Sequence, residues 1–164
     1  MSWRFVAYPV LTYVVQAAFL GPFFGVWFNP NLMVLLVVST AYVMGHSAGI
    51  KMGVTTGLLV DLGNGQWLGL HLLLYLGLAV VASQIGEILR QEQFLLPFLL
   101  SFVGVYATGF IALGLVHLVS GVNFAFYVPN VTTSAFYTAL LSPLFFRHFY
   151  ALRLKISAYG RKFA

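Results

Sequence analysis

The sequence predicts an all-α, polytopic membrane protein: a compact bundle of six transmembrane helices. Hydrophobic residues make up 61% of the 164 residues and charged residues only 7%, whereas a soluble domain of this size carries roughly 25% charged residues. Apolar runs long enough to cross the hydrocarbon core also recur along the chain. Most of the surface must therefore face lipid, and the length predicts one transmembrane domain, residues 1–164.

Six apolar segments are candidate transmembrane helices, because each approaches the roughly 20 residues that a crossing needs. They cover residues 4–21, 29–45, 48–63, 67–86, 94–119 and 131–150. The fourth and fifth are the most continuous. His46, Ser47 and Lys51 interrupt the second and third, which could instead form short tilted helices or a hairpin that turns near the interface. Residues 151–164 follow as a basic tail.

The basic residues predict the orientation of the bundle. With six crossings, all eight Lys and Arg residues fall on one side of the membrane, and the loops on the other side carry none. The positive-inside rule then places both termini in the cytoplasm. The net charge of +5 therefore reflects orientation and attraction to anionic lipid, with no nucleic-acid partner.

The tail carries most of these basic residues. If it is helical, Phe149, Leu152, Ile156 and Tyr159 share one face, which suits a helix lying in the headgroup layer; a frayed basic tail is the alternative. The residues predicted to contact lipid or cytoplasmic partners are Arg147, Arg153, Lys155, Arg161 and Lys162.

A ladder of small residues marks the third segment. Gly49, Gly53, Gly57 and Asp61 recur every four residues and so share one helix face. Small residues let helix backbones approach closely in lipid, so this ridge should be buried against neighbouring helices. The turn signal at residues 63–65 then makes the third and fourth segments an antiparallel pair. The predicted helix-packing or structural residues are Gly49, Gly53, Gly57, Asp61, Gly63, Gly65, Gly69 and His71.

Asp61 itself allows two interpretations. In the first it is a structural carboxylate that ends the ridge, with Asn64, Gln66 and the amides of Gly63 and Gly65 as local hydrogen-bond donors. His71, one turn into the next segment, could then face back toward it. In the second it is the proton- or substrate-binding group of a small carrier, because ionisable residues inside membranes are often functional.

Several kinds of chemistry lack the residues that they need. Asp61 is the only aspartate, so it has no partner for an aspartyl-protease pair. Of the four histidines, His46 and His148 fall on the inner side of the membrane and His71 and His117 on the outer side, so the four cannot converge on a zinc ion. The chain has no cysteine and no phosphate-binding loop or dinucleotide fingerprint. We therefore expect no enzymatic activity, no metal and no cofactor.

Aromatic residues crowd two of the predicted outer loops. They form either an ordinary interfacial belt or an apolar docking surface for the membrane-proximal segment of another protein. The residues predicted to bind a partner are Phe23, Phe24, Trp27, Phe28, Phe124, Phe126 and Tyr127.

Three short motifs follow one another along the chain. Pro30-Asn31-Leu32 opens an apolar run, Gly57-Leu58-Leu59-x-Asp61-Leu62 ends the ridge, and Leu68-Gly69-Leu70-His71 opens the next segment. Taken in this order, they resemble the bacterial rod shape-determining MreD family. The chain departs from the family at Leu72 and Leu73, where smaller residues are common. Length, hydropathy and the short basic tail fit over the remaining chain.

The resemblance implies a multi-pass protein of the bacterial cytoplasmic membrane and a scaffold of the cell-elongation machinery that directs peptidoglycan synthesis. It implies direct binding to MreC, with the MreB filament and the polymerase–transpeptidase pair as indirect neighbours, and no known enzymatic activity. The family also resembles in fold the substrate-capturing subunits of energy-coupling-factor transporters. This likeness keeps a second function open, a small-molecule-binding transporter subunit or a proton-coupled carrier that uses Asp61.

Overall fold

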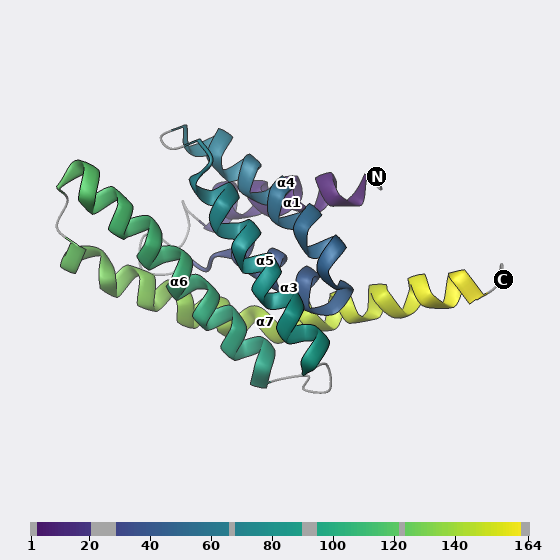
Figure 1. Ribbon diagram of the computed structural model, residues 1–164. Coiled ribbons are helices and arrows are strands. Elements are labelled where there is room, and N and C mark those ends of the chain that lie inside the picture. The colour runs from purple at the N-terminus through teal and green to yellow at the C-terminus, as the bar shows by residue number, and fades with distance from the viewer. Residues whose placement is uncertain (1–2, 21–28, 66–67, 90–94, 122–123, 162–164) are drawn as a thin grey trace.

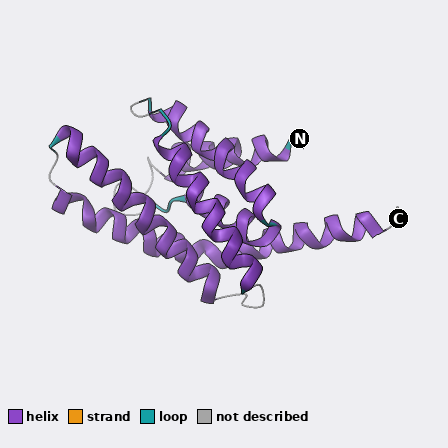
Figure 2. Ribbon diagram, in the orientation of Figure 1, coloured by secondary structure: helices purple, strands orange, loops and turns teal. Residues whose placement is uncertain are grey.

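The computed structural model describes residues 3–20, 29–65, 68–89, 95–121 and 124–161. Helices are the only regular secondary structure in these ranges (Figure 2). In chain order they are α1 (Arg4–Val15), the π-helix η1 (Gln16–Leu20), α3 (Leu32–Met44), α4 (His46–Asn64), α5 (Leu70–Ile88), α6 (Leu95–Ser120) and α7 (Phe124–Arg161). The all-α prediction is thus confirmed for the described residues.

The last helix differs most from its predicted segment, 131–150. It begins seven residues earlier and continues eleven residues into the basic tail, as a single helix of 38 residues. Pro129 and Pro143 both lie inside it, and no glycine occurs between residues 124 and 159 to end it. By helical rise α7 is about 57 Å long, well beyond the roughly 30 Å of a hydrocarbon core.

α3 lies at the centre of the bundle (Figure 1). It packs against α4, α5 and α7 and also contacts α1 and α6, and all its residues from Leu32 to Val43 are buried. A helix that is apolar on every side is expected to be enclosed in this way. It is only about 20 Å long by helical rise, so it ends inside the bundle, where its terminal amides need partners from other helices.

The glycine ridge of α4 lies against two helices. A Cβ atom built on Gly49 would stand 2.6 Å from the Cβ of Ala41 in α3. A Cβ on Gly53 would lie 2.8 Å from the carbonyl oxygen of Tyr75, and one on Gly57 would lie 2.5 Å from the Cα of Leu72, both in α5. No side chain fits at these contacts, so the backbones of α4 and α5 touch along the ridge.

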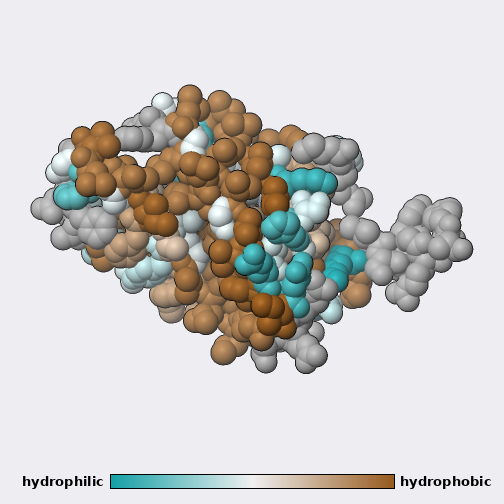
Figure 3. Space-filling model, in the orientation of Figure 1, coloured by the Kyte–Doolittle hydropathy of each residue, from teal (hydrophilic) through white to brown (hydrophobic). Residues whose placement is uncertain are grey.

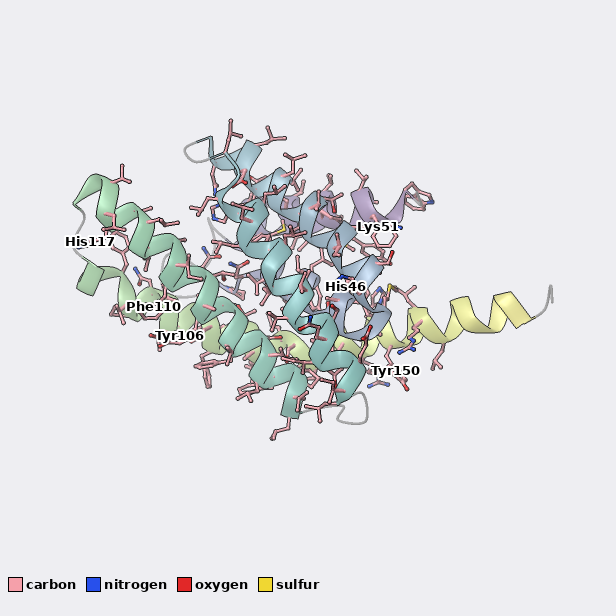
Figure 4. All side chains as sticks on the ribbon, viewed as in Figure 1. His46, Lys51, Tyr106, Phe110, His117 and Tyr150 are labelled. Carbon is pink, nitrogen blue, oxygen red and sulfur yellow. The ribbon has the colours of Figure 1, made fainter. Side chains whose placement is uncertain are left out.

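The surface of the bundle is largely apolar. Figure 3 shows hydrophobic residues over most of one face, with the largest hydrophilic group close to where α7 leaves the bundle. In Figure 4, His46 and Lys51 lie toward this end and His117 lies at the far end of α6. Two described helices, Leu70–Ile88 and the Leu95–Val119 part of α6, are long and apolar enough to cross a membrane; Phe5–Ala18 and Leu32–Met44 are apolar but shorter.

Candidate functional site

The carboxylate of Asp61 joins α4 to the start of α5. Its side chain is 1% exposed. One oxygen, Oδ1, accepts a hydrogen bond from the main-chain N–H of His71 (3.0 Å) and lies 2.9 Å from His71 Nδ1. The other, Oδ2, accepts from the main-chain N–H groups of Gly69 (2.9 Å) and Leu72 (3.0 Å). An ionised carboxylate can only accept, so Nδ1 of His71 is the donor in this contact.

The position of this carboxylate follows from how the two helices end and begin. The first amides of a helix have no partner within it, and the positive helix terminus favours a negative charge beside it. At the end of α4 the carbonyl oxygen of Asp61 accepts from the N–H of Gly65 (3.0 Å), which adopts φ +65°. The main chain of Asp61 therefore closes one helix while its side chain caps the next.

The donors differ from those expected near Asp61 in sequence. The amide of Gly65 bonds the main-chain carbonyl of Asp61 instead of its carboxylate, and Gln66 lies outside the described residues. Gly63 has a different neighbour: a Cβ at that position would overlap the ring and hydroxyl group of Tyr13 in α1. The donors lie instead beyond the turn, at residues 69–72. Gly69 adopts φ +98° just before α5, and the first main-chain amides of this helix are directed at Asp61.

A second set of polar contacts surrounds the buried start of α3. The side-chain oxygen of Asn31 accepts from the N–H of Val34 (3.1 Å) as an N-cap. Gln16 Oε1 accepts from the N–H of Leu32 (3.1 Å), and Thr138 Oγ1 accepts from the N–H of Asn31 (2.7 Å). Side chains of η1 and α7 thus satisfy amides that water would otherwise have to reach.

Tyr75 connects the two sets. Its side chain is buried and lies near the side chain of Asn31. Its ring packs edge-on against the ring of His71, with centroids 5.9 Å apart. A continuous polar cluster, which we call the polar joint, therefore runs from α4 through α5 and α3 to α7. Its members are Asp61, His71, Tyr75, Asn31, Gln16 and Thr138.

The polar joint brings together all three sequence motifs that drew attention at first. Its remaining members, Gln16, Tyr75 and Thr138, were missed as site residues. Asn31 carries a recognisable N-cap signal ahead of an apolar run. Thr138, by contrast, meets Asn31 across 107 residues of chain, and no local pattern marks such a contact.

The other predicted site residues fall elsewhere. Phe23, Phe24, Trp27 and Phe28 lie outside the described residues, as does Lys162. Phe124, Phe126 and Tyr127 belong to the first turn of α7 and not to a loop, and Tyr127 is exposed. Arg147 is exposed and Arg153 is half-buried. Lys155 and Arg161 lie in the last turns of α7, and their side chains are not among those described.

What the polar joint can do chemically is limited by its contacts. Each carboxylate oxygen of Asp61 already has two partners, and the amides around Asn31 are satisfied by side chains. In the described part of the chain no three His, Asp or Glu side chains come close enough to hold a metal ion. The fold and this cluster define the class of protein, an all-helical membrane protein in which buried polar groups fasten helices together.

The comparison with protein families gives the particular member of this class. Residues 2–152 match the family described as rod shape-determining protein MreD, and the chain belongs to that family. The resemblance seen in the three motifs is confirmed, and the chain is a rod shape-determining membrane protein. Comparison with curated proteins and with solved structures finds no match.

Proposed function

We propose that this protein is an integral scaffold of the bacterial cell-elongation machinery, without catalytic activity, and that it binds MreC within the cytoplasmic membrane. One observation carries the scaffold assignment: the only aspartate of the chain is used entirely to hold α4 to α5. A carrier that used Asp61 to bind a proton or a substrate would have to exchange these partners in each cycle. Breaking them would leave three main-chain donors without acceptors and loosen the close contact between α4 and α5.

The proposed topology has six crossings with both termini in the cytoplasm. It is supported by the clustering of hydrophilic residues near the origin of α4 and the exit of α7 (Figures 3 and 4). Alkaline phosphatase fused after residue 125 should be active, and the same enzyme fused after residue 164 should be inactive. The reverse pattern would refute this orientation. We also propose that the helices share the arrangement of energy-coupling-factor substrate-capturing subunits, which an experimental structure would test by superposition.

The outer end of the α6–α7 pair is the surface we propose for MreC. α6 is about 39 Å long by helical rise, so its last turn reaches the outer membrane interface. Leu118 and Val119 in that turn are 80% and 65% exposed, and exposed Tyr127 follows in α7. An apolar surface at this level suits the membrane-proximal segment of a single-span partner. MreB and the polymerase–transpeptidase pair would then be reached through MreC.

Site-specific photo-cross-linking in native membranes tests this surface. A photoreactive residue at Leu118 should cross-link to MreC. The matched control is Leu62, which is 64% exposed at the outer end of α4 and should not cross-link. Cross-linking at 62 but not at 118 would move the interface to another face. MreC that fails to co-purify with the wild-type protein would refute the partnership itself.

A further inference from the structure

The C-terminal part of α7 leaves the bundle as an uninterrupted helix (Figure 1). Two aromatic anchors hold it just before it leaves. Phe146 packs edge-on against Tyr42 of α3 with ring centroids 5.4 Å apart, and Phe149 packs against Tyr8 of α1 at 5.7 Å. Both phenylalanines are buried. The helix continues for about 18 Å beyond Phe149, so the bundle fixes the direction in which this extension points.

The two aromatic anchors determine which face of the C-terminal part of α7 packs on the bundle and which face is free of it. The face that contains Phe149 and Leu152, expected from the sequence to lie in the headgroup layer, instead packs on the bundle: Phe149 is buried and Leu152 contacts the core. The opposite face carries Arg147, Tyr150 and Leu154. Tyr150 is 42% exposed and Leu154 is 58% exposed, and Figure 4 shows Tyr150 where the helix departs.

The charge of this segment has one sign. α7 contains Arg147, Arg153, Lys155 and Arg161 and no acidic residue along its whole length. The free face thus combines the exposed side chains of Tyr150 and Leu154 with the cation of Arg147, beside the last buried turn. Basic side chains with apolar neighbours are the composition of helices that lie at a membrane surface, where cations meet headgroup phosphates and apolar groups enter the acyl boundary.

We propose that α7 from Arg147 onward binds the phosphate groups of anionic phospholipids on the cytoplasmic side, through a face centred on Arg147, Tyr150 and Leu154. Charge complementarity selects this partner, because the segment offers cations to a surface rich in phosphate. The assignment of this contact to the cytoplasmic side rests on the orientation proposed above. The lipid binding itself does not depend on MreC. The helix would fix the depth and tilt of the bundle through its aromatic anchors.

A fluorescent probe at residue 154 tests this proposal in the full-length protein. The chain has no cysteine, so Leu154→Cys can be labelled at one position with an environment-sensitive dye. The labelled protein is reconstituted in vesicles of phosphatidylcholine alone or mixed with phosphatidylglycerol. The anionic vesicles should shift the emission to the blue and reduce quenching by acrylamide about threefold, since each cation near such a surface strengthens binding about fivefold. Molar salt should abolish the difference.

Two charge variants in the labelled protein localise the effect. Arg147→Gln/Arg153→Gln/Arg161→Gln should remove the difference between the two kinds of vesicle. The matched control, Arg4→Gln/Lys51→Gln/Arg90→Gln, removes as many charges outside α7 and should retain it.

The same probe readings can overturn the proposal. Equal probe readings in both kinds of vesicle, for labelled protein with all its charges, would refute the proposal. An equal loss of the difference between vesicles in both charge variants would also refute it. Protection in native membranes but not in anionic vesicles would also refute it and would indicate a protein partner instead. Because the vesicles contain no second protein, none of these results bears on the scaffold function.

Discussion

Replacing Asp61 with asparagine keeps the size of the side chain but removes one hydrogen-bond acceptor from the polar joint. The carboxylate accepts through both oxygens, with Gly69 and Leu72 on one and His71 on the other. Asparagine offers one oxygen and one NH₂ group. Its least costly orientation turns the oxygen toward Gly69 and Leu72 and the NH₂ group toward His71.

The cost of this orientation can be worked out from the contacts. Nδ1 of His71 can lose its proton to the other ring nitrogen and accept from the new NH₂ group, but the main-chain N–H of His71 then has no acceptor. An unsatisfied buried donor costs about 1–3 kcal/mol, and loss of the negative charge at the start of α5 adds about 0.3–1 kcal/mol. We therefore expect Asp61→Asn to lower the free energy of unfolding by about 1–4 kcal/mol, a substantial share of a typical 5–15 kcal/mol.

Equilibrium unfolding of the purified protein in mixed micelles measures this quantity. The control is Glu87→Gln, which neutralises an exposed carboxylate near the other end of α5 and should change stability by no more than about 0.5 kcal/mol. If Asp61→Asn were as stable as the wild type, the carboxylate would not be the fastening that its contacts indicate. A structural role therefore does not imply that asparagine is tolerated at this position.

Two further substitutions test other parts of the bundle by the same unfolding measurement. Gly57→Ala should lower the free energy of unfolding by about 1–3 kcal/mol because its Cβ would meet the backbone of Leu72. The control is Gly77→Ala, where no atom lies within 4 Å of the new Cβ; it should leave the free energy of unfolding unchanged or raise it by up to about 1 kcal/mol. Similar losses for both would contradict close packing of α4 on α5. Thr138→Val should cost about 1–3 kcal/mol by leaving the N–H of Asn31 without its acceptor. Its control is Thr133→Val, which loses bonds only to the carbonyls of its own helix and should stay within about 0.5 kcal/mol; a silent Thr138→Val would show that the start of α3 needs no cap from α7.

The local features of this fold were accessible from the sequence, because they rest on periodicity and turn chemistry. The four-residue spacing of Gly49, Gly53 and Gly57 indicated a packed ridge, and these positions do lie against Ala41, Tyr75 and Leu72. The side of α4 on which Asp61 lies follows from the same spacing.

Two features were not accessible, for physical reasons. The partners of Asp61 depend on the turn between α4 and α5: Gly65 closes α4 onto the carbonyl of Asp61, and this leaves the carboxylate free to reach the amides beyond Gly69. The contact of Thr138 with Asn31 depends on how α7 packs on α3, which no segment of the sequence records by itself. The start of α7 was placed seven residues too late because Phe124, Phe126 and Tyr127 were assigned to an outer loop, whereas the helix begins at Phe124.

The most direct test of the scaffold account is the shape of cells that depend on the Asp61→Asn variant. The measurement is made at a low growth temperature at which the amount of folded variant in the membrane equals that of the wild type. If Asp61 serves only to fasten helices, these cells should grow as rods of normal width, because a folded bundle still presents the surface proposed for MreC. Rounded cells at wild-type levels of folded protein would contradict the account and would assign the carboxylate a chemical task of its own.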